Sequence, residues 1–365
     1  MIKINYPQNR KRFHKQYIDK LNINKKLRRH FYRLMNYTNL KRFNINYLDY
    51  ILLAPFEELL KIVFSNTLTT KELEKLKIFF NYDYKSKNKF QPKIKSFFEK
   101  ELIIKTCYFC NIDFVNSFND RDDYHDFLDF IKRAKKEDLL KLKGIGDVKA
   151  DKIIAERNDI NNSQLIKSLI LNNSSINLED KYNHFTLDHV LDKGSHPLIA
   201  LSLYNFVPSC YSCNSKFKGS KQFIDNDSMG YLSPTSDNFS FDDDVKFKLY
   251  FHNNKDILTI KDKSDYILDF FYYKNQNEYE KYIDIFKLKG RYIFHKDEVM
   301  NLIDKKERYS QSQIDEISNI VNISSIHIKK DIFGKELFEG NIEDVSMTKF
   351  KKDIAKDIKL INENS

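Results

Sequence analysis

All four cysteines of this 365-residue chain fall into two short pairs, Cys107-Tyr-Phe-Cys110 and Cys210-Tyr-Ser-Cys213. A CxxC turn places two thiolates where both can bind one ion, and two such turns complete the tetrahedral S4 set that zinc prefers. About a hundred residues separate the pairs, but loop-closure entropy grows only logarithmically with length. The pattern therefore predicts one structural Zn2+ site that joins two distant segments.

The alternative is two separate redox pairs. That motif belongs in a thioredoxin-like βαβ context, which the sequence around these cysteines does not indicate. A filled S4 shell leaves no open position for a substrate. Any chemistry is therefore expected elsewhere in the chain.

The charge of the chain is unevenly distributed. The net charge is +10, and residues 1–45 hold 13 Lys or Arg but a single acid, Asp19. Such a segment attracts polyanions, and nucleic acid is the commonest one inside cells. A solvated helical face or a contact for an acidic partner protein would have the same composition. No signal-peptide pattern and no apolar stretch of about 20 residues is present, so we expect a cytoplasmic protein without a membrane segment.

Hydrophobic periodicity predicts a mainly helical α+β protein. We expect a basic helical region over 1–104, a zinc-stapled core over 105–220 and a mixed region over 221–365 that ends in helices. Within the core, 184–220 indicates strand, loop, strand and helix. Short strands are predicted at Val245–Phe251 and Ile257–Lys261.

Polar residues with catalytic chemistry flank the second cysteine pair. Asp188 and His189 are adjacent, Asn205 follows, and Asn214 comes directly after Cys213. Asp188 and the Asn214 amide oxygen are hard ligands suited to Mg2+ or Mn2+. A neutral His189 can take a proton from water near neutral pH, and Asn205 could fix its tautomer by hydrogen bonding the ring. Each match is weak alone, because Asn is abundant here and a histidine beside a strand is often structural.

The run Leu187-Asp-His-Val, His196-Pro and Leu203-Tyr-Asn-Phe-Val-Pro-Ser-Cys-Tyr-Ser-Cys-Asn-Ser-Lys-Phe-Lys-Gly219 resembles the HNH (ββα-metal) endonuclease family in its zinc-bearing form, which ends in C-x-x-C-N-x-x-K. The resemblance implies a ββα fold wrapped on one catalytic divalent cation. It assigns His189 as general base, Asn205 as the middle Asn, and Asp188 and Asn214 as metal ligands.

This sequence departs from the family pattern in two places. Asn214 stands where the name-giving motif has its second His, a variant that also occurs in active members such as the HNH domains of RNA-guided nucleases. The lysine comes one place early, at Lys216, with another at Lys218. We expect Lys216 to contact DNA.

Between the cysteine pairs, Leu142-Lys-Gly-Ile-Gly146 followed by Ala150 resembles a helix-hairpin-helix DNA-binding module at about 135–160. The glycines permit a tight turn, and its backbone N–H groups can bind a phosphate. Such a module holds the DNA backbone rather than the bases, although similar turns also join helices that bind nothing. The DNA contacts predicted here are Lys143, Gly144, Ile145, Gly146 and Lys149.

Together these features predict a metal-dependent endonuclease that hydrolyses DNA with low sequence specificity. Its expected cofactors are a catalytic Mg2+ or Mn2+ and a structural Zn2+. A looser likeness to HNH proteins of bacterial anti-phage defence loci leads us to expect a regulatory partner, such as an ATPase or a sensor subunit. Two alternatives stay open: a non-catalytic zinc-stapled DNA-binding protein, and a nuclease that acts on RNA.

Overall fold

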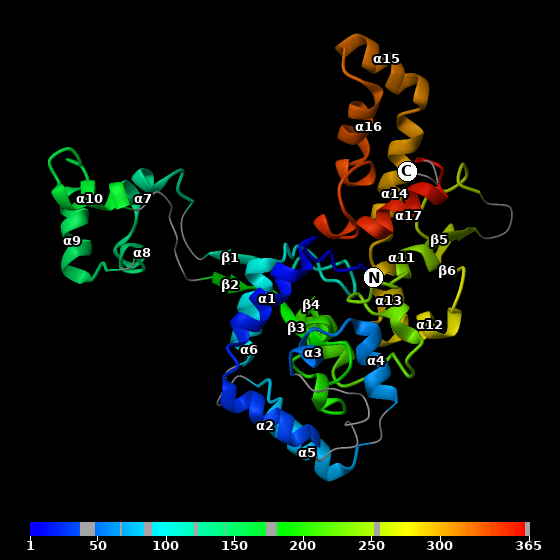
Figure 1. Ribbon diagram of the computed structural model, residues 1–365. Coiled ribbons are helices and arrows are strands. Elements are labelled where there is room, and N and C mark those ends of the chain that lie inside the picture. Colours follow the sequence, from blue (N-terminus) through cyan, green and yellow to red (C-terminus); the bar gives the residue numbers. More distant parts are fainter. Residues whose placement is uncertain are drawn as a thin grey trace. The chain divides into compact units, whose positions relative to one another are not determined.

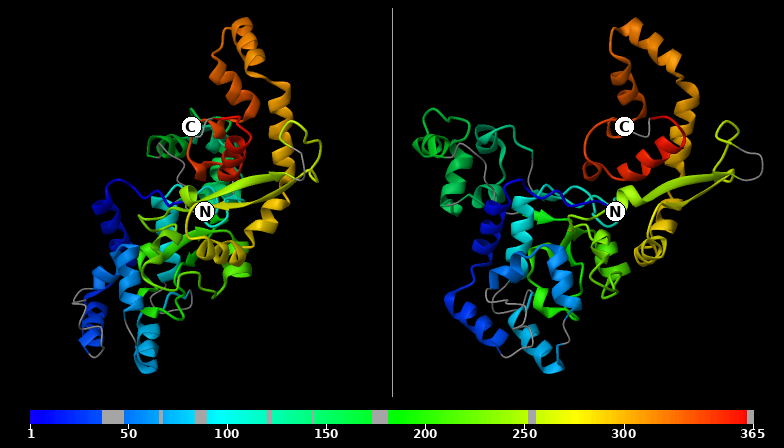
Figure 2. Two further views of the ribbon diagram at one scale, coloured as in Figure 1. Left: turned by 90° about the vertical axis from the view of Figure 1, so that its right-hand side faces the viewer. Right: turned by 45° about the vertical axis from the view of Figure 1, so that its right-hand side comes forward.

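The computed structural model divides the chain into two compact units. Unit 1 comprises Met1–Asn116 and Phe185–Ser365, and unit 2 is the insertion Ser117–His184. Helices predominate, and the strands form three two-stranded antiparallel sheets in the described residues (Figure 1, with further views in Figure 2). The expected mainly helical α+β class is confirmed. The structure describes residues 1–36, 48–65, 68–83, 90–119, 123–142, 144–172, 181–251 and 256–361.

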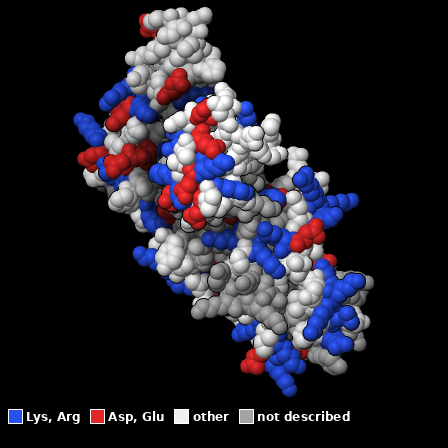
Figure 3. All heavy atoms as spheres, turned by 90° about the vertical axis from the view of Figure 1, so that its left-hand side faces the viewer, with Lys and Arg blue, Asp and Glu red and all other residues white. Residues whose placement is uncertain are grey.

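The N-terminal part of unit 1 is helical. Helix α1 begins after Asn9, whose side chain accepts a hydrogen bond from the Arg12 N–H. Its apolar face packs on α6, where the rings of Phe13 and Tyr17 each lie 5.0 Å from that of Phe97. Figure 3 shows Lys and Arg side chains gathered at the lower end of the view, over α2 and α5. The helices in this part are α1 (Arg10–Leu21), α2 (Lys25–Asn36), α3 (Leu48–Leu53), α4 (Phe56–Phe64), α5 (Thr70–Phe79) and α6 (Phe90–Glu101).

The segment that follows unit 2 forms a hairpin and a helix. Strand β3 (Thr186–His189) pairs antiparallel with β4 (Phe206–Ser209), so that His189 lies opposite Phe206. Helix η4 (Ser212–Lys218), which is of the π type, follows and contacts β3. The order strand, loop, strand, helix predicted for 184–220 is confirmed. The loop between the strands contains two 3-10 turns, η2 (Pro197–Ile199) and η3 (Leu203–Asn205).

The C-terminal part of unit 1 contains a long hairpin and further helices. Strand β5 (Val245–Phe251) is found where predicted, but its partner is β6 (Tyr266–Tyr272) and not Ile257–Lys261. That segment turns instead, because Asp256 and Thr259 side chains accept hydrogen bonds from backbone N–H groups at 3.0 and 2.9 Å. The helices here are η5 (Met229–Leu232), α11 (Phe241–Asp244), α12 (Gln276–Ile285), α13 (Leu288–Ile293), α14 (Lys296–Arg308), α15 (Gln311–Val321), α16 (Ser325–Phe333), η6 (Lys335–Leu337), η7 (Ile342–Asp344) and α17 (Thr348–Asp357).

One hydrophobic core runs through unit 1. It joins buried side chains of the N-terminal helices, both cysteine pairs, the β3–β4 hairpin and the C-terminal helices. The two compact units meet between residues 116 and 117 and between residues 184 and 185. The sequence predicts region boundaries near 104 and 220 instead.

Unit 2 has a smaller core of its own, to which Phe130, Leu139 and Ile153 contribute. Its two ends pair as strands, with Asn119 opposite Lys181. The chain therefore enters and leaves the insertion at neighbouring positions. Its elements are β1 (Ser117–Asn119), α7 (Phe127–Arg133), α8 (Lys136–Leu140), α9 (Asp147–Glu156), α10 (Gln164–Asn172) and β2 (Lys181–Asn183).

Replacing residues 120–180 by Asn-Gly should leave unit 1 folded. Asn119 and Lys181 are paired across the β1–β2 ladder, and Asn-Gly favours the turn that closes a two-residue hairpin. We expect cooperative thermal unfolding, followed by circular dichroism, within a few degrees of the full chain. A shortened chain that aggregates or unfolds without a transition would contradict the division into two units.

Candidate functional site

The four cysteine side chains meet in the interior of unit 1. All four are buried, and their Sγ atoms lie within 4.8 Å of one another. The Cys210 N–H donates to Cys107 Sγ at 3.3 Å, and the Cys213 N–H donates to Cys210 Sγ at 3.4 Å. Such N–H groups stabilise thiolates, the form that binds metal. The two distant pairs thus form one cluster that could hold a structural ion such as Zn2+.

An arginine balances the charge of this cluster. Arg291 of α13 donates to Cys213 Sγ at 3.2 Å and to Cys110 Sγ at 3.4 Å, and it pairs with Asp113 at 3.0 Å. Four thiolates around a dication carry net negative charge, so a nearby guanidinium stabilises the loaded cluster. Sequence reasoning missed Arg291, because it lies 78 residues beyond Cys213 and no motif spacing connects them.

The first cysteine pair is anchored by C-terminal segments. The Tyr292 hydroxyl donates to the Cys110 carbonyl at 2.5 Å. Asn111, which follows in the left-handed region at φ 55°, accepts from the Lys349 N–H at 3.2 Å through its side chain. The C-terminal helices therefore hold the loop that carries two of the four sulfurs.

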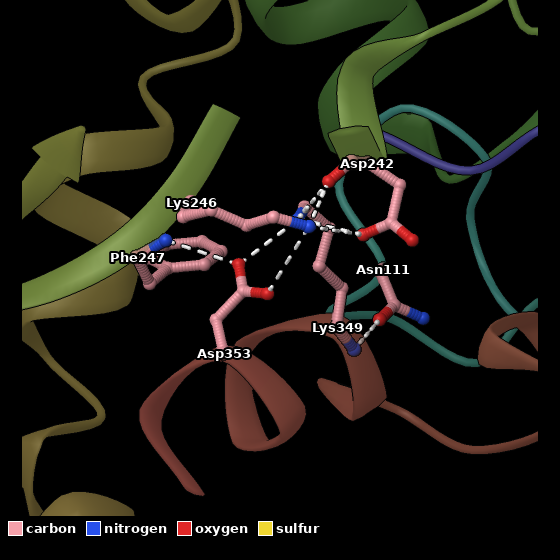
Figure 4. A network of polar contacts seen from close by, with 6 residues as sticks. All are labelled: Asn111, Asp242, Lys246, Phe247, Lys349 and Asp353. Atoms are coloured by element: carbon pink, nitrogen blue, oxygen red, sulfur yellow. Dashed lines mark hydrogen bonds and ion pairs between the residues drawn. The ribbon is translucent and has the colours of Figure 1, made fainter. Parts of the chain in front are cut away.

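Lys349 extends this anchor to the β5–β6 hairpin (Figure 4). Its fully buried Nζ lies 2.8 Å from Asp242 Oδ1 and 2.9 Å from Asp353 Oδ2. Asp353 also accepts from the Phe247 N–H of β5 at 3.0 Å, and Lys246 approaches it at 4.0 Å. Because each buried charge has a partner, removing one member alone would leave an uncompensated charge inside the protein.

Purified protein should carry one zinc per chain, and Cys107→Ser should lose it, because three sulfurs no longer complete the S4 shell. Arg291→Met should keep the zinc but release it faster to a chelator. The matched control is Lys289→Met, on the same helix but paired with Asp269, which should leave the release rate unchanged. Elemental analysis and a colorimetric chelator assay measure both quantities. Zinc-free protein with a normal melting transition would refute the cluster's structural role.

Asp188 of β3 points a buried carboxylate toward η4. The residue is 4% exposed, and its Oδ2 has no hydrogen-bond donor, although Lys218 Nζ lies 3.1 Å away outside hydrogen-bond geometry. Burial raises the pKa of this carboxyl to about 6, while the Lys218 ammonium acts in the opposite direction. A carboxylate oxygen without a donor is suited to a hard cation such as Mg2+.

Lys218 is the neighbour that sequence reasoning did not select. It is 1% exposed at its side chain and donates to the His189 carbonyl at 2.7 Å and to Asp188 Oδ1 at 3.3 Å. It belongs to the π-helix η4, in which the Gly219 N–H bonds the Asn214 carbonyl five residues back. Each turn of such a helix contains more than four residues, so Lys218 lies almost one turn beyond Asn214, on nearly the same face.

Asn214 and Lys216, the two residues of η4 that the sequence predicts to be functional, differ in burial. Asn214 is half-buried, and its role as a metal ligand beside Asp188 stays a prediction. Lys216 is exposed, with its Nζ 5.7 Å from the Phe217 ring centroid. Its DNA contact stays a prediction, whereas the lysine that reaches β3 is Lys218.

His189 is held as a neutral imidazole. The residue is 7% exposed, and its Nε2 lies 2.9 Å from the Ala200 carbonyl oxygen. A carbonyl only accepts, so Nε2 carries the proton and Nδ1 keeps its lone pair. Tyr82 packs edge-on against the ring at 4.8 Å between centroids. Burial lowers the imidazole pKa to about 4, so at neutral pH the ring can accept a proton.

Asn205 does not form the predicted hydrogen bond with His189. Its buried amide oxygen accepts from the Leu191 N–H at 2.9 Å, and its Nδ2 donates to the carbonyls of Leu191 at 3.0 Å and Ile199 at 3.3 Å. Asn205 thus braces the loop that carries Ala200, and the Ala200 carbonyl fixes the tautomer instead. The expected hydrogen bond from Asn205 to the imidazole is therefore wrong, and the side chain positions the loop instead; a role for Asn205 in catalysis stays a prediction.

A hollow of about 430 Å³ is lined by two residues that contact the imidazole, although His189 itself does not line it. Tyr82 and Ala200, which both contact His189, form part of its wall. Its charged lining residues are Lys77, Asp83 and Lys193.

Unit 2 contains the predicted helix-hairpin-helix. Helices α8 and α9 pack against one another, with Ala150 fully buried between them. Gly144 adopts a φ of +81° in the turn, a conformation that glycine adopts without strain. Gly146 is the N-cap of α9, and Ile145 packs into the core of unit 2.

The charge beside this turn is mixed. Lys149 folds back and donates to the Gly144 carbonyl at 3.0 Å. Asp147 opens α9 and pairs with Lys136 at 3.4 Å. Lys143 lies outside the described residues. The helical geometry of the module is present, and its contact with DNA stays a prediction.

No protein-family model, curated protein or solved structure matches the chain. In the part of the chain that the structure describes, no helix has the length and apolar character needed to cross a membrane.

The His189 ring should stay neutral well below the pH at which ordinary histidines titrate. Its pKa of about 4 lies below the unperturbed value of about 6.5, so the lowered pKa keeps the unprotonated form between these two pH values. We expect its ring 13C and 1H shifts to stay constant from pH 7.5 to about 5.5, with the signal assigned by its loss in His189→Ala. Titration near pH 6.5 would contradict the buried, carbonyl-bound ring.

Proposed function

We propose that this chain is a metal-dependent endonuclease of the HNH kind that hydrolyses DNA phosphodiester bonds. The observation that carries the proposal is the pair on β3: a buried Asp188 carboxylate held by Lys218, next to a neutral, tautomer-fixed imidazole on His189. Burial raises the pKa of the Asp188 carboxyl and lowers the pKa of the His189 ring.

The residues of the site divide the hydrolysis between them. His189 Nδ1 would take a proton from the attacking water as the new P–O bond forms. Asp188 and Asn214 would hold a Mg2+ or Mn2+ ion, which neutralises charge on the phosphate and on the leaving oxygen. Lys218, 3.1 Å from Asp188, would keep that carboxylate ionised and in place. The leaving oxygen takes up a proton from solvent.

The wider surface supports a polyanionic substrate. The exposed faces of α1 and α2 carry Lys and Arg, and Lys77 lines the hollow whose wall includes Tyr82 and Ala200. Such contacts go to the phosphate backbone and carry no base information. They support cleavage with low sequence preference.

A second candidate is a zinc-stapled nucleic-acid-binding protein without catalysis, and Lys218 favours it. Its ammonium already compensates the single carboxylate of the site, and His189 is only 7% exposed. In this alternative, the Asp188–Lys218 pair is a structural ion pair of the hairpin. The two candidates differ in whether the chain cuts.

Incubation of supercoiled plasmid with the protein and Mg2+ or Mn2+ should give nicked and linear products, and leaving out the added ion should abolish them. His189→Ala should lower the cleavage rate by about 10²–10⁴-fold, the usual contribution of a general base. His125→Ala removes a histidine whose side chain is 91% exposed in unit 2 and should leave the rate unchanged.

Zinc content and DNA affinity of His189→Ala should match the wild type, so that lost cleavage is not lost folding. Parallel incubation with RNA tests the other polymer. Wild-type protein that binds DNA but cuts neither polymer with any of these ions supports the second candidate instead.

A further inference from the structure

The outward face of the β5–β6 hairpin forms a second charged hollow, far along the chain from His189. It has a volume of about 740 Å³ and lies where the hairpin meets the end of α17. We call it the lysine hollow. Its lining residues are Lys246, Phe247, Lys248, Phe271, Tyr273, Asp353, Lys356, Asp357, Lys359 and Ile361.

The charge offered by this hollow is positive. Four of its lining residues are lysines and two are aspartates. Both aspartates are used internally: Asp353 accepts from the Phe247 N–H at 3.0 Å and Asp357 from the Leu249 N–H at 2.8 Å. The carboxylates thus cover the outer edge of β5. Lys246 donates to the Asp242 carbonyl and lies 3.8 Å from Asp242 Oδ1, so Lys248 and Lys359 carry the positive charge that a ligand meets.

Exposed aromatic rings stand beside these lysines. Tyr273 is 64% exposed and Phe271 is 37% exposed, and their rings meet edge-to-face at 4.9 Å between centroids. Lys246 is paired directly opposite Phe271 across the sheet, and Lys248 Nζ lies 5.1 Å from the Phe271 ring centroid. Lysine side chains and exposed aromatic rings therefore lie next to one another on this face of the hairpin.

We propose that the lysine hollow binds an unpaired strand of nucleic acid, with phosphates at the lysines and bases stacked on Tyr273 and Phe271. Positive charge selects a polyanion, and exposed rings select one that offers flat π-faces, which unpaired bases do and a duplex backbone or an acidic peptide does not. The choice of nucleic acid among polyanions rests on the proposed nuclease function. The hollow would hold a single-stranded flank or product strand apart from the cleavage site.

The test measures binding of the full-length, zinc-loaded protein to a fluorescein-labelled 20-nucleotide oligo-dT by anisotropy, with no Mg2+ or Mn2+ added so that cleavage does not occur. Tyr273→Ala should weaken this binding at least about fivefold, the lower end of what one stacked base contributes. Lys248→Ala should weaken it too and should reduce its salt dependence. The effect of Tyr273→Ala on a 20-base-pair duplex should be less than twofold.

The matched control is Phe294→Ala, which removes a ring that is 81% exposed outside the hollow and should leave the affinity unchanged. Wild-type protein that does not bind oligo-dT, or Tyr273 and Lys248 variants that bind it normally, would overturn the proposal. A labelled oligo-glutamate that binds as tightly as oligo-dT would show that the surface serves an acidic protein instead.

The two proposals fail separately. If Tyr273→Ala cleaves plasmid and binds oligo-dT as the wild type does, the proposal for the lysine hollow is wrong and the proposed nuclease function stands. If the protein binds oligo-dT through Tyr273 but cleaves no nucleic acid, the proposed nuclease function is wrong and the lysine hollow is a binding surface only.

Discussion

The arrangement of unit 1 depends on bringing four sulfur atoms to one point. Cys107 and Cys110 precede the insertion, whereas Cys210 follows β4 and Cys213 lies in η4, so the cluster joins segments that are about a hundred residues apart. Four thiolates buried together repel one another unless a cation lies among them, which couples ion binding to folding. Arg291 reduces this repulsion, and the helix that carries Asn214 and Lys218 begins at the cluster.

The candidate site has an unusual distribution of protons. Burial disfavours the charged form of both adjacent side chains on β3. The Asp188 carboxyl therefore holds its proton more tightly than usual, and the His189 ring holds its second proton less tightly. Near pH 5 the acid is therefore largely protonated while the base is still neutral, the reverse of the order in water. Above about pH 6 the strand presents one anion and one proton acceptor, which is the state that a metal-assisted hydrolysis requires.

The cysteine cluster and the β3–β4–η4 order could be predicted from the sequence, because CxxC spacing and strand alternation are local signals. The contacts of Asn205 could not, because a buried amide bonds to whichever backbone groups its loop leaves unpaired. The burial of Lys218 against β3 could not be predicted either, because the C-x-x-C-N-x-x-K pattern falls on Phe217, between Lys216 and Lys218, and only tertiary packing brings Lys218 to Asp188. Strand β6 was misplaced because Ile257–Lys261 has apolar residues but turns through Asp256 and Thr259. Arg291 reaches the sulfurs by tertiary packing alone.

Asn111 joins the first cysteine pair to helix α17. It directly follows a sulfur ligand, and it hydrogen bonds α17 through the Lys349 N–H, while the other end of α17 borders the lysine hollow. Helix α17 therefore connects the surface at the lysine hollow to the loop that carries two of the four sulfur atoms. The packing of the C-terminal hairpin and the geometry of the first cysteine pair share this one helix as a support.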